Sequence, residues 1–136
     1  MRTALVPIDS SAPALRALRH AMAVCDDIQI INVQARADSP VLLLHRTQDE
    51  IDRLQMENGR SQLGEARKVL GDAGRAFKEH VLVGEPAATI VNVARAEGVD
   101  IIVMGTRGMG AFGNLVLGST ANKVIHLAEL PVTVVK

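Results

Sequence analysis

Residues 100–120 of the chain read DIIVMGTRGMGAFGNLVLGST, and this stretch decides the fold. It begins with an apolar run at residues 101–104, of the kind that forms a strand covered on both faces of a parallel sheet. Five of the eleven glycines of the chain follow within residues 105–120, and glycine permits the close backbone approach that a phosphate-binding loop needs. Gly118-Ser119-Thr120 stands where the next helix begins, so free N–H groups of that helix point into the loop and the two hydroxyls add donors. The stretch therefore predicts a strand, a loop suited to an anion, and a helix.

Outward from this stretch, strand patterns alternate with helical patterns along the whole chain. Strands are predicted at residues 3–9, 28–33, 81–83, 101–104 and 132–135. Helices are predicted after Ser10 or Ser11 up to Cys25, from Thr47 to about Ala73 with a break near Gly59 and Gly64, from Pro86 to Gly98, and from Ala121 to Ala128. Residues 41–44 fit either a short strand or a helical turn. The alternation predicts an α/β fold with one doubly wound, five-stranded parallel sheet and helices on both of its faces.

The length and composition describe a chain that can fold without metals or disulfides. Its 136 residues fit a single domain, residues 1–136, and 48% of them are apolar. Fifteen basic residues balance fifteen acidic ones, and two phenylalanines are the whole aromatic content. Neither an electrostatic nor a base-stacking nucleic-acid binder is therefore expected. No apolar window reaches about eighteen residues and no leader segment is visible, which predicts a soluble cytoplasmic protein without membrane contact.

A ligand of an open α/β sheet binds outside the carboxyl ends of the strands. Asp9 stands at the tip of the first strand at this edge, and the glycine-rich loop follows the fourth. No nucleophile with a base and an orienting group can be identified, and the four histidines share no metal-ligand spacing. The sequence therefore predicts a binding site with no catalytic residue and no metal ligand of its own.

Two familiar glycine motifs compete for the loop. Gly108-x-Gly110-x-x-Gly113 matches a dinucleotide fingerprint as a string, but it stands before the last strand and not after the first. Gly113-x4-Gly118-Ser119-Thr120 is similar to a P-loop, but Ser119 replaces the lysine that reaches the phosphates. Both motifs therefore lack part of the context that their chemistry requires.

A third pattern, Gly105-x2-Gly108-x9-Gly118-Ser119, resembles the nucleotide-binding motif of the universal stress protein family, in its ATP-binding branch. Further segments resemble the same family: residues 5–11 (LVPIDSS) its first strand and turn, residues 100–108 (DIIVMGTRG) its fourth strand and loop, and residues 117–124 (LGSTANKV) with 131–136 (PVTVVK) its ending. The resemblance covers the whole chain and implies the adenine nucleotide alpha hydrolase-like fold, with the strand order 3-2-1-4-5. Ser10 departs from the family, which commonly has glycine at this turn.

The resemblance also implies an ATP site, with Mg²⁺ or Mn²⁺ accompanying the nucleotide. An apolar slot for the base, a carboxylate for the ribose hydroxyls and a helix N-terminus for the phosphates would form such a site. The implied binding residues are Pro7, Ile8, Asp9, Val33, Met104, Gly105, Arg107, Gly108, Gly118, Ser119, Thr120 and Ala121. Among them Asp9 would contact the adenosine and Val33 the adenine, whereas the four residues from Gly118 onward would line the phosphates.

The function that follows is the binding of ATP as a regulatory ligand in a stress response. Two alternatives stay open: a weak ATPase or autophosphorylating enzyme on the same fold, and a dimeric interaction protein of the family that binds no nucleotide. An efficient enzyme is not expected, because the chain shows no dedicated base for an attacking water. Members of the family commonly pair their last strands, and the branched run Val132–Val135 at a sheet edge predicts a homodimer through this strand.

Overall fold

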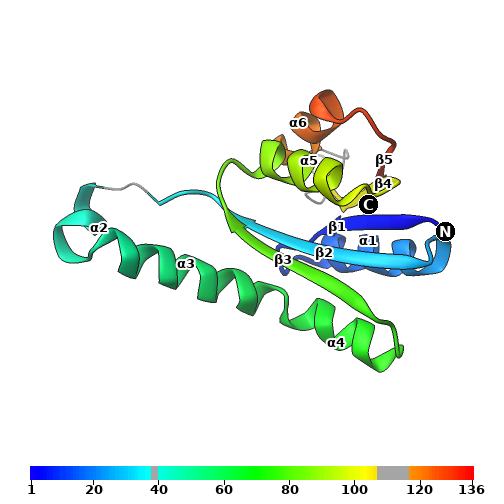
Figure 1. The fold of residues 1–136 in the computed structure, drawn as a ribbon, viewed down its shortest axis with the longest axis horizontal. Coiled ribbons are helices and arrows are strands. Elements are labelled where there is room, and N and C mark those ends of the chain that lie inside the picture. The colour runs from blue at the N-terminus through cyan, green and yellow to red at the C-terminus, as the bar shows by residue number, and fades with distance from the viewer. Residues whose placement is uncertain (38–39, 107–116) are drawn as a thin grey trace, which may run out of the picture.

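The computed structural model describes residues 1–37, 40–106 and 117–136, which form a five-stranded sheet with helices on both faces (Figure 1). The strands are β1 (Thr3–Pro7), β2 (Asp27–Gln34), β3 (Phe77–Val83), β4 (Ile101–Gly105) and β5 (Val132–Val135). The helices are α1 (Ala12–Val24), α2 (Pro40–His45), α3 (Gln48–Gln62), α4 (Gly64–Asp72), α5 (Pro86–Glu97) and α6 (Ser119–Leu127). All neighbouring strands pair in parallel, in the order β3-β2-β1-β4-β5. The predicted fold class and strand order are thereby confirmed.

Two apolar layers fill the spaces between the sheet and its helices. On one face, Leu18 of α1 and Leu70 of α4 belong to one buried cluster with Val6 of β1. On the other face, Ile90 of α5 and Val124 of α6 belong to a second cluster. In Figure 1, α5 and α6 lie on one side of the strands, and α1, α3 and α4 lie on the other. β1 is the central strand, so the ends of β1, β2 and β4 lie next to one another.

Local sequence signals set the ends of several helices as predicted. Ser11 caps α1, because its hydroxyl accepts a hydrogen bond from a backbone N–H of the first turn at 3.3 Å. Thr47 caps α3 in the same way at 3.1 Å. α5 starts with Pro86, which needs no N–H at the first helical position. It ends at Gly98, whose φ of 65° lies in the left-handed region that favours glycine.

The polar helix predicted after Thr47 breaks at one of its two glycines only. α3 runs through Gly59 without interruption, and the break comes where α4 begins at Gly64. Gly59 is buried where α3 packs on β2 and β3. A Cβ at this position would lie 2.5 Å from Val81 Cγ1 and 3.0 Å from Asn32 Oδ1. Glycine at this position therefore allows the helix to approach the sheet closely and does not end it.

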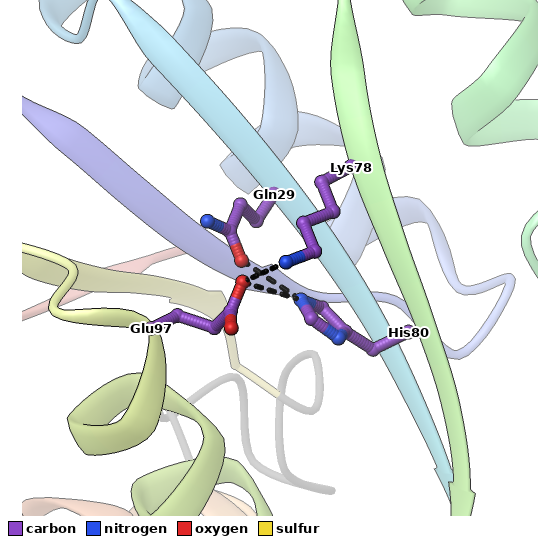
Figure 2. Close-up of polar contacts among 4 residues, drawn as sticks. All are labelled: Gln29, Lys78, His80 and Glu97. Atoms are coloured by element: carbon purple, nitrogen blue, oxygen red, sulfur yellow. Dashed lines mark hydrogen bonds and ion pairs between the residues drawn. The ribbon is translucent and has the colours of Figure 1, made fainter.

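β3 begins at Phe77 and is therefore longer than the predicted residues 81–83. The prediction missed its first half because the polar side chains there do not follow the apolar pattern of a strand. Lys78 Nζ donates a hydrogen bond to Glu97 Oε1 of α5 at 2.5 Å. His80 Nε2 lies 2.8 Å from Gln29 Oε1 of β2 and 3.8 Å from Glu97 Oε1 (Figure 2). These contacts tie the edge strand β3 to the end of α5. Polar residues are accommodated here because β3 lies at the edge of the sheet.

Two apolar residues of the helices are exposed. Leu54 of α3 is 45% exposed and Ile125 of α6 is 41% exposed. The first half of α3, which includes Leu54, extends with α2 beyond the ends of the strands (Figure 1). α6 covers the sheet with Ala121 and Val124, and this leaves Ile125 on the outer side. Within the described residues, no helix combines the length and the apolarity needed to cross a membrane.

Candidate functional site

A cavity of about 280 Å³ lies at the carboxyl ends of β1, β2 and β4, which is where an open α/β sheet binds its ligands. The predicted site residues that line it are Pro7, Ile8, Asp9, Val33, Met104, Gly105, Gly118, Thr120 and Ala121. Ser119 begins α6 but is not among the lining residues. Arg107 and Gly108 lie outside the described residues. The fold thus brings segments that are far apart in the sequence to one cavity.

The turn after β1 presents a carboxylate at the cavity. Asp9 Oδ1 accepts a hydrogen bond from the backbone N–H of Ser11 at 3.0 Å. Ser10, between them, has a φ of 65°, a left-handed conformation that costs a non-glycine residue about 1–2 kcal/mol. Asp9 therefore stabilises the turn with one oxygen. Its second oxygen, Oδ2, is able to accept a hydrogen bond from a ligand.

The N-terminus of α6 meets the cavity with free backbone donors. Gly118 is the N-cap residue and provides no side-chain cap. The first helical hydrogen bond runs from Asn122 N to Gly118 O at 3.1 Å, so the N–H groups of the three residues between them have no acceptor within the helix. Thr120 and Ala121, two of these three, line the cavity. The positive end of the helix dipole adds to an environment that favours an anion.

Thr106, directly after β4, is a lining residue that the sequence did not single out. The residue is only 3% exposed, and its backbone N–H donates to Val135 O at 2.9 Å. Among the described residues, its hydroxyl oxygen is the buried side-chain polar atom without a hydrogen-bond partner. Buried polar groups are almost always paired, but this hydroxyl has no partner in the parts of the chain that the structure describes.

Four amide side chains, here called the amide cluster, connect β2 to α3 beside the cavity. Its members are Asn32, Gln34, Asn58 and Gln62. Asn32 is 3% exposed, and both Asn32 and Gln62 line the cavity. The sequence prediction missed this cluster, although an asparagine inside the apolar run of β2 is a signal that a buried polar partner exists.

The polar cluster of Figure 2 lies away from the cavity, since none of its four residues lines it. Burial lowers the pKa of His80 below its ordinary value of 6.5, Glu97 opposes this shift, and Lys78 reinforces it. The hydrogen bond from Lys78 lowers the pKa of Glu97. At neutral pH the cluster therefore holds a neutral imidazole and an ionised carboxylate. Within the described parts of the chain, no group of three or more His, Cys, Asp or Glu side chains is placed to hold a metal ion.

The strand order and the cavity define a doubly wound α/β protein with a cavity at its topological switch point. Within this class, the chain belongs to the universal stress protein family, because the model of that family matches residues 1–136. Universal stress protein MJ0531 of Methanocaldococcus jannaschii is 32% identical over 136 residues, which cover 97% of this chain and 80% of that protein.

Solved structures of relatives share the architecture. Protein MJ0577 of Methanocaldococcus jannaschii aligns with a TM-score of 0.80 and 30% identity, over 99% of this chain and 95% of its own. A universal stress protein from Archaeoglobus fulgidus in complex with dAMP aligns with a TM-score of 0.67 and 25% identity, over 100% and 98% of the two chains. The five-stranded fold described above is thus shared with solved members of the family.

Proposed function

We propose that this protein binds an adenine nucleotide, ATP, in the cavity at the ends of β1, β2 and β4, and that ATP acts as a regulatory ligand in a stress response. One observation carries the proposal. Apolar side chains, a carboxylate and a free helix N-terminus converge on a single cavity of about 280 Å³. These are the surfaces that the base, the ribose and the phosphates of a nucleotide require.

The parts of the nucleotide have natural places along the cavity. Val33 offers apolar surface for the base, and Met104 borders the ligand. Asp9 Oδ2 would accept a hydrogen bond from a ribose hydroxyl, since Oδ1 already accepts from the backbone of the turn. The N–H groups of Thr120 and Ala121 would donate to phosphate oxygens.

One detail of the cavity wall supports a ligand of this kind. Gly118 has a φ of −64° and a ψ of 159°, a conformation that any residue adopts, so the backbone itself does not require glycine there. Because Gly118 lines the cavity at the N-terminus of α6, we attribute its glycine to the ligand and not to the backbone.

The comparisons support the adenine part of the proposal. The relative from Archaeoglobus fulgidus holds dAMP and shares this fold over the whole chain. The spacing Gly105-x2-Gly108-x9-Gly118-Ser119 supports ATP in particular, with Arg107 and Gly108 as further contacts proposed from the sequence. Mg²⁺ or Mn²⁺ is proposed as the counter-ion that accompanies the triphosphate, with no side chain assigned to it.

We also propose that the protein acts in the cytoplasm as a homodimer of a single domain, joined through β5. β5 is the edge strand next to β4, and all four of its residues are half-buried in the single chain. An edge strand of branched apolar residues offers unpaired backbone groups to another chain. Antiparallel pairing of two copies of Val132–Val135 would extend the sheet from one protomer into the other.

Two measurements test the nucleotide proposal. The first is mass spectrometry of the small molecules released when freshly purified protein is denatured, with stoichiometric ATP or ADP as the expected result. The second is thermal unfolding of nucleotide-free protein with added ATP and Mg²⁺, where ligand at a hundred times its dissociation constant stabilises by about 2.7 kcal/mol. Protein that is purified empty and whose melting temperature ignores ATP would refute the proposal.

A matched pair of variants places the phosphates. Gly118→Val should abolish the ATP-induced rise in melting temperature, because the side chain would occupy the space beside the N-terminus of α6. The same change at Gly64, where an added Cβ meets nothing within 4 Å, should leave ATP binding intact. If Gly118→Val binds ATP as tightly as the wild type, the placement of the phosphates is wrong.

A further inference from the structure

The orientation of the buried amide of Asn32 is determined by the backbone. Asn32 Nδ2 lies 2.7 Å from Ile8 O, and a backbone carbonyl can only accept a hydrogen bond. The nitrogen of Asn32 must therefore face Ile8. The same nitrogen donates to Gln62 Oε1 at 2.8 Å. Because that contact needs an acceptor, the oxygen of Gln62 has to face Asn32.

The hydrogen bonds in the rest of the amide cluster are consistent with this orientation. Asn32 Oδ1 accepts from Gln34 Nε2 at 2.8 Å, and Gln34 Oε1 accepts from Asn58 Nδ2 at 2.9 Å. A flip of any one amide would place two donors or two acceptors against each other. The carbonyl of Ile8 thus sets the orientation of both amides that line the cavity.

Gln62 is left with its NH₂ group available. Its oxygen is engaged by Asn32, whereas Nε2 makes no hydrogen bond to the parts of the chain that the structure describes. Gln62 lines the cavity and is only partly exposed. The cluster therefore presents a hydrogen-bond donor of fixed identity, and not an amide that can turn either atom toward a ligand.

We infer that Gln62 is a specificity-determining residue, which donates through Nε2 to an unprotonated ring nitrogen of the base of the bound nucleotide. The inference rests on the proposed function. Gln62 contacts β2, whereas the N-terminus of α6 follows β4, and these two strands lie on opposite sides of β1. With the phosphates at α6, the base lies at the β2 end, beside Val33 and Gln62. The ring nitrogens N1, N3 and N7 of adenine accept hydrogen bonds, so they match a donor of this kind.

Gln62→Glu tests the donor directly. Glutamate keeps an oxygen for Asn32 Nδ2 and replaces the NH₂ group with a second oxygen of similar size. Exposed Ser61 is the neighbouring residue on α3, so Ser61→Glu adds the same charge outside the cavity. Isothermal titration should show ATP affinity reduced about tenfold or more in Gln62→Glu. The hydrogen-bond donor is lost, and an acceptor oxygen then faces the acceptor nitrogen of the base. Ser61→Glu should stay within about twofold, because exposed charges are screened.

Analogues of ATP identify the acceptor without relying on a variant. 1-Deaza-, 3-deaza- and 7-deaza-ATP each lack one ring nitrogen, and the wild type should bind one of them more weakly than ATP. Gln62→Glu should bind that analogue with little further loss, because the two changes remove the same contact. The inference is refuted, and the proposed function stands, if the wild type binds ATP but Gln62→Glu binds it equally well. The same holds if the losses of affinity from Gln62→Glu and from each analogue simply add. If the wild type binds no nucleotide, both are refuted.

Discussion

Gly105 at the end of β4 lies directly against the backbone of Pro13 in the first turn of α1. A Cβ on Gly105 would lie 2.5 Å from the carbonyl carbon of Pro13 and 2.6 Å from its oxygen. Real Cβ atoms do not approach backbone so closely, so the helix or the strand would have to move. Gly105, the first glycine of the pattern Gly105-x2-Gly108-x9-Gly118-Ser119, is therefore required by the packing of α1.

Gly105→Ala should destabilise the protein by about 1–3 kcal/mol, because an added methyl forces a backbone shift in a packed region. Urea unfolding measures the change in the free energy of unfolding. Gly71→Ala is the matched control, since an added Cβ there meets nothing within 4 Å in α4. This control should be neutral or stabilising by up to about 1 kcal/mol. Equal stability of the two variants would contradict the contact with Pro13.

Asn32→Asp should destabilise the protein by about 3 kcal/mol or more. The change places a carboxylate oxygen against the carbonyl of Ile8, where Nδ2 now donates, and it buries a charge without a partner. Asn58→Asp alters an exposed member of the amide cluster and should cost about 1 kcal/mol or less. Urea unfolding of both variants at pH 7 measures the difference. A loss at Asn32 no larger than at Asn58 would mean that the amide orientation is wrong.

The free energy of unfolding should fall as the pH is lowered through about 6.5. Burial lowers the pKa of His80 in the native state below its ordinary value of 6.5, so the unfolded chain binds a proton more readily than the folded one. This contribution to stability is present above the unfolded-state pKa and is lost as the pH falls through the lower native-state pKa. Urea unfolding between pH 5 and 8 should show a shallower fall in His80→Gln. An unchanged slope in that variant would place the titration elsewhere.

Val134→Pro should produce a folded monomer if β5 joins two protomers. Ile102 N donates to Pro131 O and Thr106 N donates to Val135 O, so odd-numbered residues of β5 direct their backbone groups toward β4. By alternation, Val134 directs its N–H toward the open edge, where proline removes only a donor for a second chain.

Thr133→Pro is the control for this variant, because it removes an N–H that faces β4. It should therefore lower the free energy of unfolding by about 1–3 kcal/mol. Sedimentation at tens of micromolar distinguishes the outcomes. The proposed interface is wrong if the wild type sediments as a monomer, or if Val134→Pro remains a dimer.

Elements whose ends are marked by proline or glycine can be predicted closely from this sequence. Pro131 precedes β5, Pro86 begins α5 and Gly98 ends it, and each of these signals acts within its own segment. Contacts between distant segments are the part that local patterns miss. Gly59 carries the signal of a helix break, but its role is decided by Val81 on another element. The polar half of β3 fails the apolar pattern of a strand because its partners, such as Glu97, come from α5.

The residues of the candidate site also fall into those that local patterns indicate and those that depend on distant contacts. Asp9 and Gly118 stand at a strand tip and a helix start, positions that sequence patterns and the family resemblance both indicate. Gln62 sits in a polar helix where nothing local distinguishes it, and its partner Asn32 is thirty residues away. Thr106 adjoins a predicted residue, but its missing hydrogen-bond partner is a property of the folded wall.

Gln62 is also the last residue of α3, so a movement of Gln62 would be transmitted along the helix. α3 has fifteen residues and is therefore a rod about 22 Å long. Its far end leaves the sheet and leads to α2 (Figure 1). Val41 and Leu44 of α2 are exposed. A tilt of about 5° imposed at the Gln62 end would displace the first turn of such a rod by about 2 Å. A small adjustment at the cavity would therefore become a larger displacement of α2 and of the surface that it forms.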